Sequence, residues 1–248
     1  YEIVMWLEFR RVLFRSEWNL FYFVLASGIQ AQSKISFTPV VHASFVIQAP
    51  GLVIYIDPVG NTEDYSSFPA PDIILITHTH GDHFNPQLIK AIETEKTKIV
   101  ANHEAVEKLG KGHALKNGEQ YFCEKIRIEA IAAYNLTPER QKFHPQGVGN
   151  GYVLNIGSER VYISGDTEDI PEMRKLKDID HAFVCMNLPY TMSVEQAASA
   201  IADFRPRNLY PYHYRNQDGS FSDVQGKLKS LLSEYPKIKI HYPVWYKK

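Results

Sequence analysis

Residues 72–86 read Asp-Ile-Ile-Leu-Ile-Thr-His-Thr-His-Gly-Asp-His-Phe-Asn-Pro, and they are the most informative stretch of the chain. The continuous apolar run Ile73–Ile76 is typical of a short strand that is buried on both faces. His78 and His80 follow the run and are two residues apart. Both imidazoles therefore project to the same side if the chain stays extended, which predicts a pair of metal ligands at the end of a buried strand.

The turn that follows His80 adds further ligand types. Gly81 permits a sharp turn, which can bring Asp82 and His83 back toward the same place. Imidazole nitrogen and carboxylate oxygen suit zinc, manganese or iron. Three histidines and one acid are more than a single tetrahedral catalytic ion needs, so the motif predicts a second ion with ligands later in the chain. The alternative is a histidine-rich surface loop that binds no metal.

At these residues the chain resembles the metallo-β-lactamase superfamily, whose hallmark is the motif His-x-His-x-Asp-His. The resemblance extends to Asp57 before the motif and to Asp166 and His213 after it, in the family's order, and spans about residues 35–245. It implies an α+β fold, the four-layer αβ/βα sandwich, in which two mixed sheets face each other and helices cover the outside.

The resemblance also implies a centre of two divalent ions, with zinc favoured and manganese or iron as alternatives. Its ligands divide into three groups: His78 and His80 on the first ion, Asp82, His83 and His213 on the second, and Asp166 bridging both. A carboxylate between two cations lowers their repulsion and fixes a separation at which one hydroxide touches both. In this mechanism Asp82 or Asp166 relays the proton to the leaving group.

The chain departs from the family pattern at one ligand of the first ion. Many members supply a third histidine just after the strand that ends here in Ala132-Ala133-Tyr134-Asn135, where this chain has none. His144 lies nine residues after Asn135 and is predicted to take this place. The alternatives are that Asn135 is the third ligand, or that this coordination position of the first ion is open.

Three further residues are candidates for a supporting role. Asp57 resembles the family's buried acid, which hydrogen-bonds a ligand imidazole and sets its tautomer. His42 resembles a histidine near the site of the lactonase-like and phosphodiesterase-like branches, with a packed core histidine as the alternative. Tyr190 is a candidate for a hydrogen bond to substrate, with aromatic packing as the alternative.

The sequence around the later ligands narrows the function. The segments 162–167, 187–192 and 210–214 most resemble the branch that contains ascorbate-6-phosphate lactonase and N-acyl-phosphatidylethanolamine phosphodiesterase. This implies a metal-dependent hydrolase that cleaves an ester, lactone or phosphodiester bond of a small-molecule substrate. An iron-dependent oxidoreductase on the same fold and a non-catalytic metal-binding module are the alternatives. Neither Cys123 nor Cys185 stands where one class of true β-lactamases has a cysteine ligand, which disfavours lactam hydrolysis.

Composition sets outer limits on the function. The 248 residues suffice for one large domain with a full core. The net charge of −1 offers no general attraction to nucleic acid, so no nucleic-acid partner is expected. The sequence does not indicate an oligomeric state.

The amino-terminal residues are interpreted separately from the domain, which we place at 33–248. Residues 20–29 are mostly apolar and follow a basic segment, which predicts a signal peptide over 19–32 with cleavage near Ala31. The apolar run is too short to span a bilayer. With a signal peptide the protein is secreted or periplasmic, and without one it is cytoplasmic. The alternative interpretation of the apolar run is a strand or helix that packs on the domain. Residues 1–18 resemble nothing in the family and stay unassigned; a sequencing remnant would explain them.

Hydrophobic periodicity predicts that every proposed ligand directly follows a strand. Strands are expected at 36–48 with a bend at 42–44, and at 52–56, 73–76, 98–101, 125–133, 152–156, 160–164, 207–212 and 238–244. Helices are expected at 86–95, 104–109, from Ser193 onward and at 222–235, and capping boxes at 169–172 and 193–196.

Overall fold

Two β-sheets form the framework of the protein. In the computed structural model, which describes residues 35–123 and 126–246, the first sheet has six strands in the order β1-β2-β3-β4-β5-β6. These are β1 (Ser36–Val41), β2 (Ser44–Ala49), β3 (Leu52–Ile56), β4 (Ile73–Ile76), β5 (Lys98–Ala101) and β6 (His113–Ala114). The first three strands are antiparallel, whereas β3 to β6 are parallel, so the sheet is mixed.

The second sheet has seven strands in the order β13-β12-β11-β10-β9-β8-β7. These are β7 (Gln120–Cys123), β8 (Ile126–Ala133), β9 (Gly149–Ile156), β10 (Glu159–Ile163), β11 (His181–Cys185), β12 (Asn208–Tyr212) and β13 (Lys239–Ile240). Strands β7 to β10 are antiparallel and β10 to β13 are parallel. Each sheet thus has an antiparallel half and a parallel half, and the predicted ligands other than His144, which lies between the antiparallel strands β8 and β9, follow strands with a parallel neighbour.

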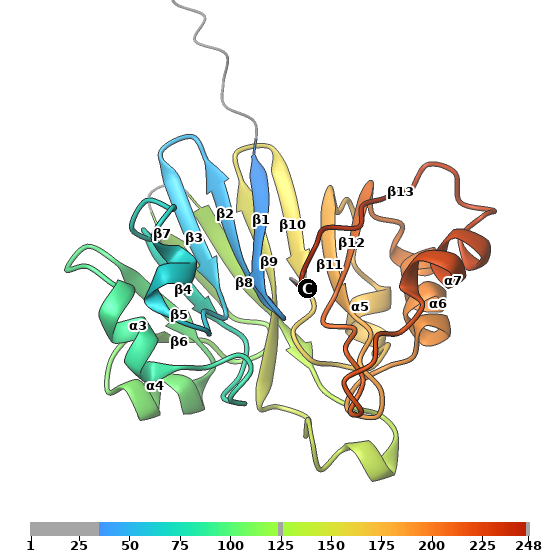
Figure 1. Ribbon diagram of the computed structural model, residues 1–248, viewed down its shortest axis with the longest axis horizontal. Helices are drawn as coiled ribbons and strands as arrows, with labels where there is room; N and C mark the ends of the chain where they lie inside the picture. The colour runs from blue at the N-terminus through green and yellow to red at the C-terminus, as the bar shows by residue number, and fades with distance from the viewer. Residues whose placement is uncertain (1–34, 124–125, 247–248) are drawn as a thin grey trace, which may run out of the picture. The chain divides into compact units, whose positions relative to one another are not determined.

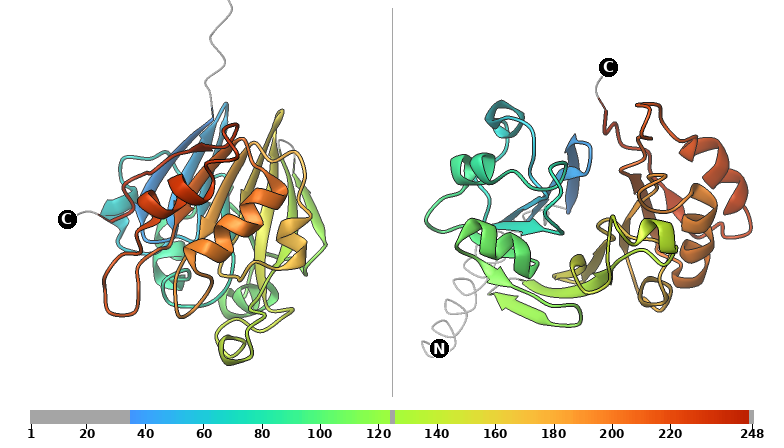
Figure 2. Two further views of the ribbon diagram at one scale, coloured as in Figure 1. Left: turned by 90° about the vertical axis from the view of Figure 1, so that its right-hand side faces the viewer. Right: turned by 90° about the horizontal axis from the view of Figure 1, so that it is seen from below.

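Helices cover the outer face of each sheet (Figure 1). On the first sheet these are α3 (Pro86–Ile92) and α4 (His103–Leu109), and on the second α5 (Pro171–Arg174), α6 (Val194–Phe204) and α7 (Val224–Leu231). Figure 2, left, looks onto α6 and α7, which lie over the second sheet. The predicted four-layer α+β sandwich is therefore confirmed.

The motif strand β4 is buried on both faces, as its apolar run predicts. Ile73 and Leu75 belong to the main core, where Phe45 of the first sheet stacks on Phe183 of the second with ring centroids 4.3 Å apart. Ile74 belongs to a separate cluster beneath α3 and α4. Because apolar contacts fix both faces of β4, its last residues are held firmly between the second sheet and the helices α3 and α4.

Two local predictions were wrong. The capping box at 169–172 does not form: α5 begins after Ile170, and the Asp169 carboxylate binds the Arg174 guanidinium instead of the helix amides. The strand predicted at 238–244 is confined to β13, partly because Pro243 has no N–H to continue the ladder. The capping box at Ser193 is present, and the helix predicted at 222–235 is shorter, as α7.

Several expectations concern residues outside the structural description. The signal peptide predicted over 19–32 and the unassigned residues 1–18 both lie outside the described residues. Within the described ranges, no helix is both long and apolar enough to cross a bilayer.

Candidate metal centre

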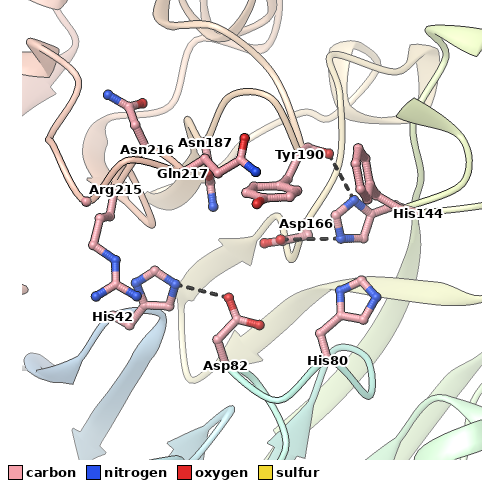
Figure 3. A pocket seen from close by; sticks show the side chains of 12 residues that line it. His42, His80, Asp82, His144, Asp166, Asn187, Tyr190, Arg215, Asn216 and Gln217 are labelled. Atoms are coloured by element: carbon pink, nitrogen blue, oxygen red, sulfur yellow. Dashed lines mark hydrogen bonds and ion pairs between the residues drawn. The ribbon is translucent and has the colours of Figure 1, made fainter. Parts of the chain in front are cut away.

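Loops that follow parallel strands of both sheets meet at one edge of the sandwich. The motif follows β4, Asp57 follows β3, Asp166 follows β10 and His213 follows β12. Because the carboxyl ends of parallel strands meet at the same edge of a sheet, residues distant in sequence lie together there. Figure 3 shows ligands from both halves of the chain facing one pocket.

A glycine allows the two sheets to approach closely at this edge. Gly165 precedes Asp166 and has φ of +60°, a left-handed conformation that favours glycine. A Cβ atom there would lie 3.3 Å from Cβ of Thr77 in the first sheet, and 2.7 Å from the carbonyl oxygen of Asn150 on the neighbouring strand β9. The absence of a side chain at Gly165 thus lets Asp166 reach the end of β4.

The first group of ligand atoms comes from His78, His80 and His144, and its members lie within 4.8 Å of one another. Nδ1 of His144 lies 3.1 Å from the carbonyl oxygen of Tyr190, to which it donates, so Nε2 is left for a metal. The Asn135 amide instead donates to the carbonyl oxygens of Tyr190 and Arg140. The structure therefore brings His144 beside His78 and His80, and the Asn135 amide braces the backbone at Tyr190 and Arg140.

Asp166 lies between this group and the remaining ligands. Its Oδ1 is 3.3 Å from Nε2 of His83, and its Oδ2 is 3.4 Å from Nε2 of His144 and 3.5 Å from Nε2 of His213. His213 Nε2 also lies 3.3 Å from Oδ2 of Asp82. One carboxylate therefore contacts imidazoles on both sides of the centre, the position that a bridging ligand occupies.

Buried polar atoms that lack a hydrogen bond test whether these residues fit a metal. Four of them meet at the centre: Nε2 of His83, His144 and His213, and Oδ1 of Asp166. Within the described residues none of these atoms makes a hydrogen bond, and their contacts across the centre are ion-pair distances of 3.3–3.5 Å. Leaving a buried polar atom unpaired costs about 1–3 kcal/mol. Nitrogen donors gathered around one carboxylate are the ligand types of zinc and similar ions, so the residues fit the predicted metals.

A buried carboxylate orients the motif. Asp57 accepts hydrogen bonds from the backbone N–H and the hydroxyl of Thr77, each at 2.7 Å. It also lies 2.8 Å from Nδ1 of His83, which fixes that ring with Nε2 toward the centre. This is the supporting role that the sequence predicted for Asp57, with Thr77 as an additional link that the pattern did not reveal.

The electrostatics of the centre favour a cation. Burial lowers the pKa of His78 well below its ordinary value, and the charge of His83 adds to this effect. Burial alone would also lower the pKa of His83, but the carboxylates of Asp166 and Asp57 outweigh it and hold this pKa well above the ordinary value. The centre therefore stabilises a positive charge on His83, and a metal ion that binds there displaces this proton.

His42 lies at the open side of the centre. Its Nε2 is 3.1 Å from Oδ2 of Asp82, and its Nδ1 is 3.0 Å from the hydroxyl of Tyr246. His42, Asp82 and His213 form a further group whose ligand atoms lie within 4.8 Å of one another. His42, Asp57 and His213 all have positive φ, a strained conformation that clusters at functional sites. His42 is thus in contact with the centre rather than an ordinary core histidine.

A pocket of about 410 Å³ opens onto the centre. Tyr190 lines it, as the sequence suggested for a substrate-binding residue, and its ring packs against Phe143 with centroids 5.0 Å apart. Arg215 and Asn187 also line it (Figure 3), and the Asn187 side chain lies 2.7 Å from Nδ1 of His213. Neither was assigned an individual role from the sequence: Asn187 begins the segment 187–192 that resembles the family, and Arg215 directly follows the segment 210–214.

Comparison with known proteins agrees with this geometry. Residues 36–213 match the family described as the β-lactamase superfamily domain. A Parabacteroides distasonis protein, provisionally named a metal-dependent hydrolase, is 46% identical, with a TM-score of 0.77 over 84% of this chain and 92% of that chain. The UPF0173 metal-dependent hydrolase of Pyrococcus furiosus is 26% identical over 82% of this chain and 94% of its own length.

A more distant structure shows the same fold. Igni18, a metallo hydrolase from Ignicoccus hospitalis, is 23% identical, with a TM-score of 0.70 over 84% of this chain and 94% of that chain. The family match over most of the chain and the relative that is 46% identical confirm the family that the histidine motif predicted. The chain belongs to the metallo-β-lactamase superfamily.

Proposed function

We propose that this protein is a hydrolase with two divalent metal ions that cleaves an ester, lactone or phosphodiester bond of a small molecule. The observation that carries this proposal is the gathering of three buried imidazole nitrogens without a hydrogen bond, from His83, His144 and His213, around the Asp166 carboxylate. The relatives are named metal-dependent hydrolases, which favours hydrolysis over the iron-dependent oxidation considered from the sequence.

The ligands would divide between the two ions as the family resemblance implies, and the ligand atoms of the first set lie within 4.8 Å of one another. The first ion would be held by His78, His80 and His144, the second by Asp82, His83 and His213, and Asp166 would contact both. The donors are imidazole and carboxylate, so zinc is the favoured metal, with manganese or iron as alternatives. When bound, such ions lower the pKa of water and polarise a carbonyl or phosphoryl oxygen.

Asp82 is better placed than Asp166 to move a proton. The side chain of Asp166 is 5% exposed, and its oxygens face three imidazoles. The side chain of Asp82 is 44% exposed and lies in the pocket, where Oδ2 accepts a hydrogen bond from Nε2 of His42. Burial alone would raise the pKa of Asp82, but hydrogen bonds from His213 and His42 hold it far below its ordinary value. Asp82 would therefore pass a proton on to a leaving group through its other oxygen rather than retain it, while His42 fixes the carboxylate.

The test is a comparison of three bond types. Zinc-loaded protein would be assayed on p-nitrophenyl acetate, bis(p-nitrophenyl) phosphate and a lactone followed with a pH indicator. We expect hydrolysis of at least one, falling by at least about 100-fold in Asp166→Asn, which removes the shared carboxylate charge. Activity that survives both this substitution and removal of metal would refute the proposal, as would hydrolysis of none of the three.

A further inference from the structure

Arg215 is the feature of the pocket that the proposed hydrolysis does not use. It lies two residues after the ligand His213 and lines the same pocket. Among the described residues that line this pocket, Asp82, Asp166 and Arg215 are the ones with a permanent formal charge, and both acids are proposed ligands. In Figure 3, Arg215 and His42 stand on the side of the pocket opposite His144.

The guanidinium of Arg215 is free to bind a ligand. In the described part of the chain, it has no ion-pair or hydrogen-bond partner, whereas Arg140 and Arg207 each bind a carboxylate. The acid nearest in sequence, Asp218, accepts hydrogen bonds from the backbone N–H and the hydroxyl of Ser220 instead. A guanidinium that faces a pocket presents several donors suited to a carboxylate or phosphate.

The loop that carries Arg215 is internally braced. Arg215 and Phe221 form an antiparallel bridge at its base. The backbone N–H of Asn216 donates to the carbonyl oxygen of Ser220 at 2.8 Å, and the Asn216 amide donates to the Ser220 hydroxyl at 3.0 Å. These bonds fix the backbone from which Arg215 extends, which reduces the entropy lost when a ligand is bound.

The charge balance of the pocket favours an anion. With two divalent ions in place, the four positive charges exceed the two negative charges of Asp82 and Asp166, and Arg215 adds one more. The remaining polar lining near Arg215 is neutral, from Asn187, Asn216 and Gln217. A substrate with a negative group would therefore be attracted into this pocket.

We propose that Arg215 binds an anionic group of the substrate, a carboxylate or a phosphate, away from the bond that is cleaved. The inference rests on the proposed function, because it takes the metal centre as the place of cleavage. It restricts the substrate class to esters, lactones or phosphodiesters that carry such an additional anionic group.

Equilibrium binding tests this without turnover. Metal-loaded protein would be titrated calorimetrically with dicarboxylates from malonate to adipate, with ω-phosphonocarboxylates, and with monocarboxylates of equal length. One carboxylate of each ligand can bind at the metals, and the second anionic group reports on Arg215. The variants are Arg215→Gln, Arg215→Lys and, as a control for net charge, Lys229→Gln on the exposed side of α7, outside the pocket.

We expect at least one dianionic ligand to bind the wild type about tenfold more tightly than its monocarboxylate, which corresponds to about 1.4 kcal/mol. This advantage falls below about twofold in Arg215→Gln, persists in part in Arg215→Lys and is unchanged in Lys229→Gln. The phosphonate and carboxylate series show which anion is preferred. No advantage in the wild type, or full retention in Arg215→Gln, overturns the inference. Failure of the hydrolysis assay alone would refute the proposed function but not this binding result.

Discussion

Nδ1 of His83 lies 2.8 Å from Oδ2 of Asp57, and both side chains are completely buried. The same carboxylate accepts two hydrogen bonds from Thr77, the residue directly before His78. Asp57 follows β3, and Thr77 follows β4. A single acid thus joins two strand ends and sets the direction of a ligand ring.

Asp57→Asn tests this relationship. All three hydrogen bonds are made to the carboxylate, so an amide, which can accept at only one atom, must turn its NH₂ group toward a donor. We expect zinc affinity to fall by about 10–100-fold, measured by competition with a chelator of known affinity. Asp72→Asn is the control, because Asp72 accepts a hydrogen bond from Val53 at the opposite end of β3. Equal losses in both variants would contradict a specific role for Asp57.

His144 and Asn135 are predicted to differ in their effect on metal content. His144→Ala removes a ligand atom of the first group, so we expect it to retain one ion per chain after dialysis. Asn135→Ala loses hydrogen bonds to two carbonyl oxygens, so we expect both ions to remain and the stability to fall by about 1 kcal/mol. If Asn135→Ala lost an ion while His144→Ala kept both, the assignment of the first site would be reversed.

Gly165→Ala tests the close approach of the sheets. The added Cβ would lie 3.3 Å from Cβ of Thr77 at the end of β4 in the first sheet, and 2.7 Å from the carbonyl oxygen of Asn150 on β9 of its own sheet, at a residue with φ of +60°. Gly157 has the same φ, but its Cβ would meet nothing within 4 Å, so Gly157→Ala carries the backbone strain alone. We expect Gly157→Ala to cost about 1 kcal/mol of unfolding free energy, and Gly165→Ala to cost more and to weaken metal binding. Identical denaturation midpoints would show that the approach is unimportant.

The order of strands and ligands was predictable because the signals are local. The apolar run Ile73–Ile76, the motif after it and the acid at the end of β10 can each be recognised within a few residues. Parallel pairing then brings these strand ends to one edge, and the structure places Asp166 and His213 together there. Local sequence patterns and the fold class were therefore sufficient to predict the positions of the motif, Asp166 and His213.

The features of the fold and the site that could not be predicted depend on contacts between residues distant in sequence. Asp169 matches a helix cap in sequence but binds Arg174, and local pattern does not show which partner prevails. His144 and Asn135 could not be separated from sequence, because the path of their loop depends on Glu168, which is about thirty residues away. Its carboxylate accepts hydrogen bonds from the backbone of Leu136 and Thr137 at 2.6 and 2.7 Å.

Glu168→Gln should therefore destabilise the protein in a pH-dependent manner. Burial alone would raise the pKa of Glu168, but hydrogen bonds from Thr137, Leu136 and Arg140 hold it below the ordinary value. A depressed folded-state pKa stabilises the protein above the unfolded-state pKa of about 4.3, and this contribution is lost as the pH falls through the folded-state value. We expect a deficit of about 1–3 kcal/mol at pH 7, measured by urea denaturation, that shrinks below about pH 4. A deficit independent of pH would contradict this.

The most direct test of the two-ion centre is the metal content of the purified protein. Wild-type protein, prepared without a chelating tag, would be loaded with zinc, dialysed and measured by elemental analysis beside Asp166→Asn. Because Asp166 contacts imidazoles on both sides of the centre, we predict two ions per chain in the wild type and fewer than one in Asp166→Asn. A wild type that holds one ion or none, or an Asp166→Asn protein that keeps two, would contradict the account.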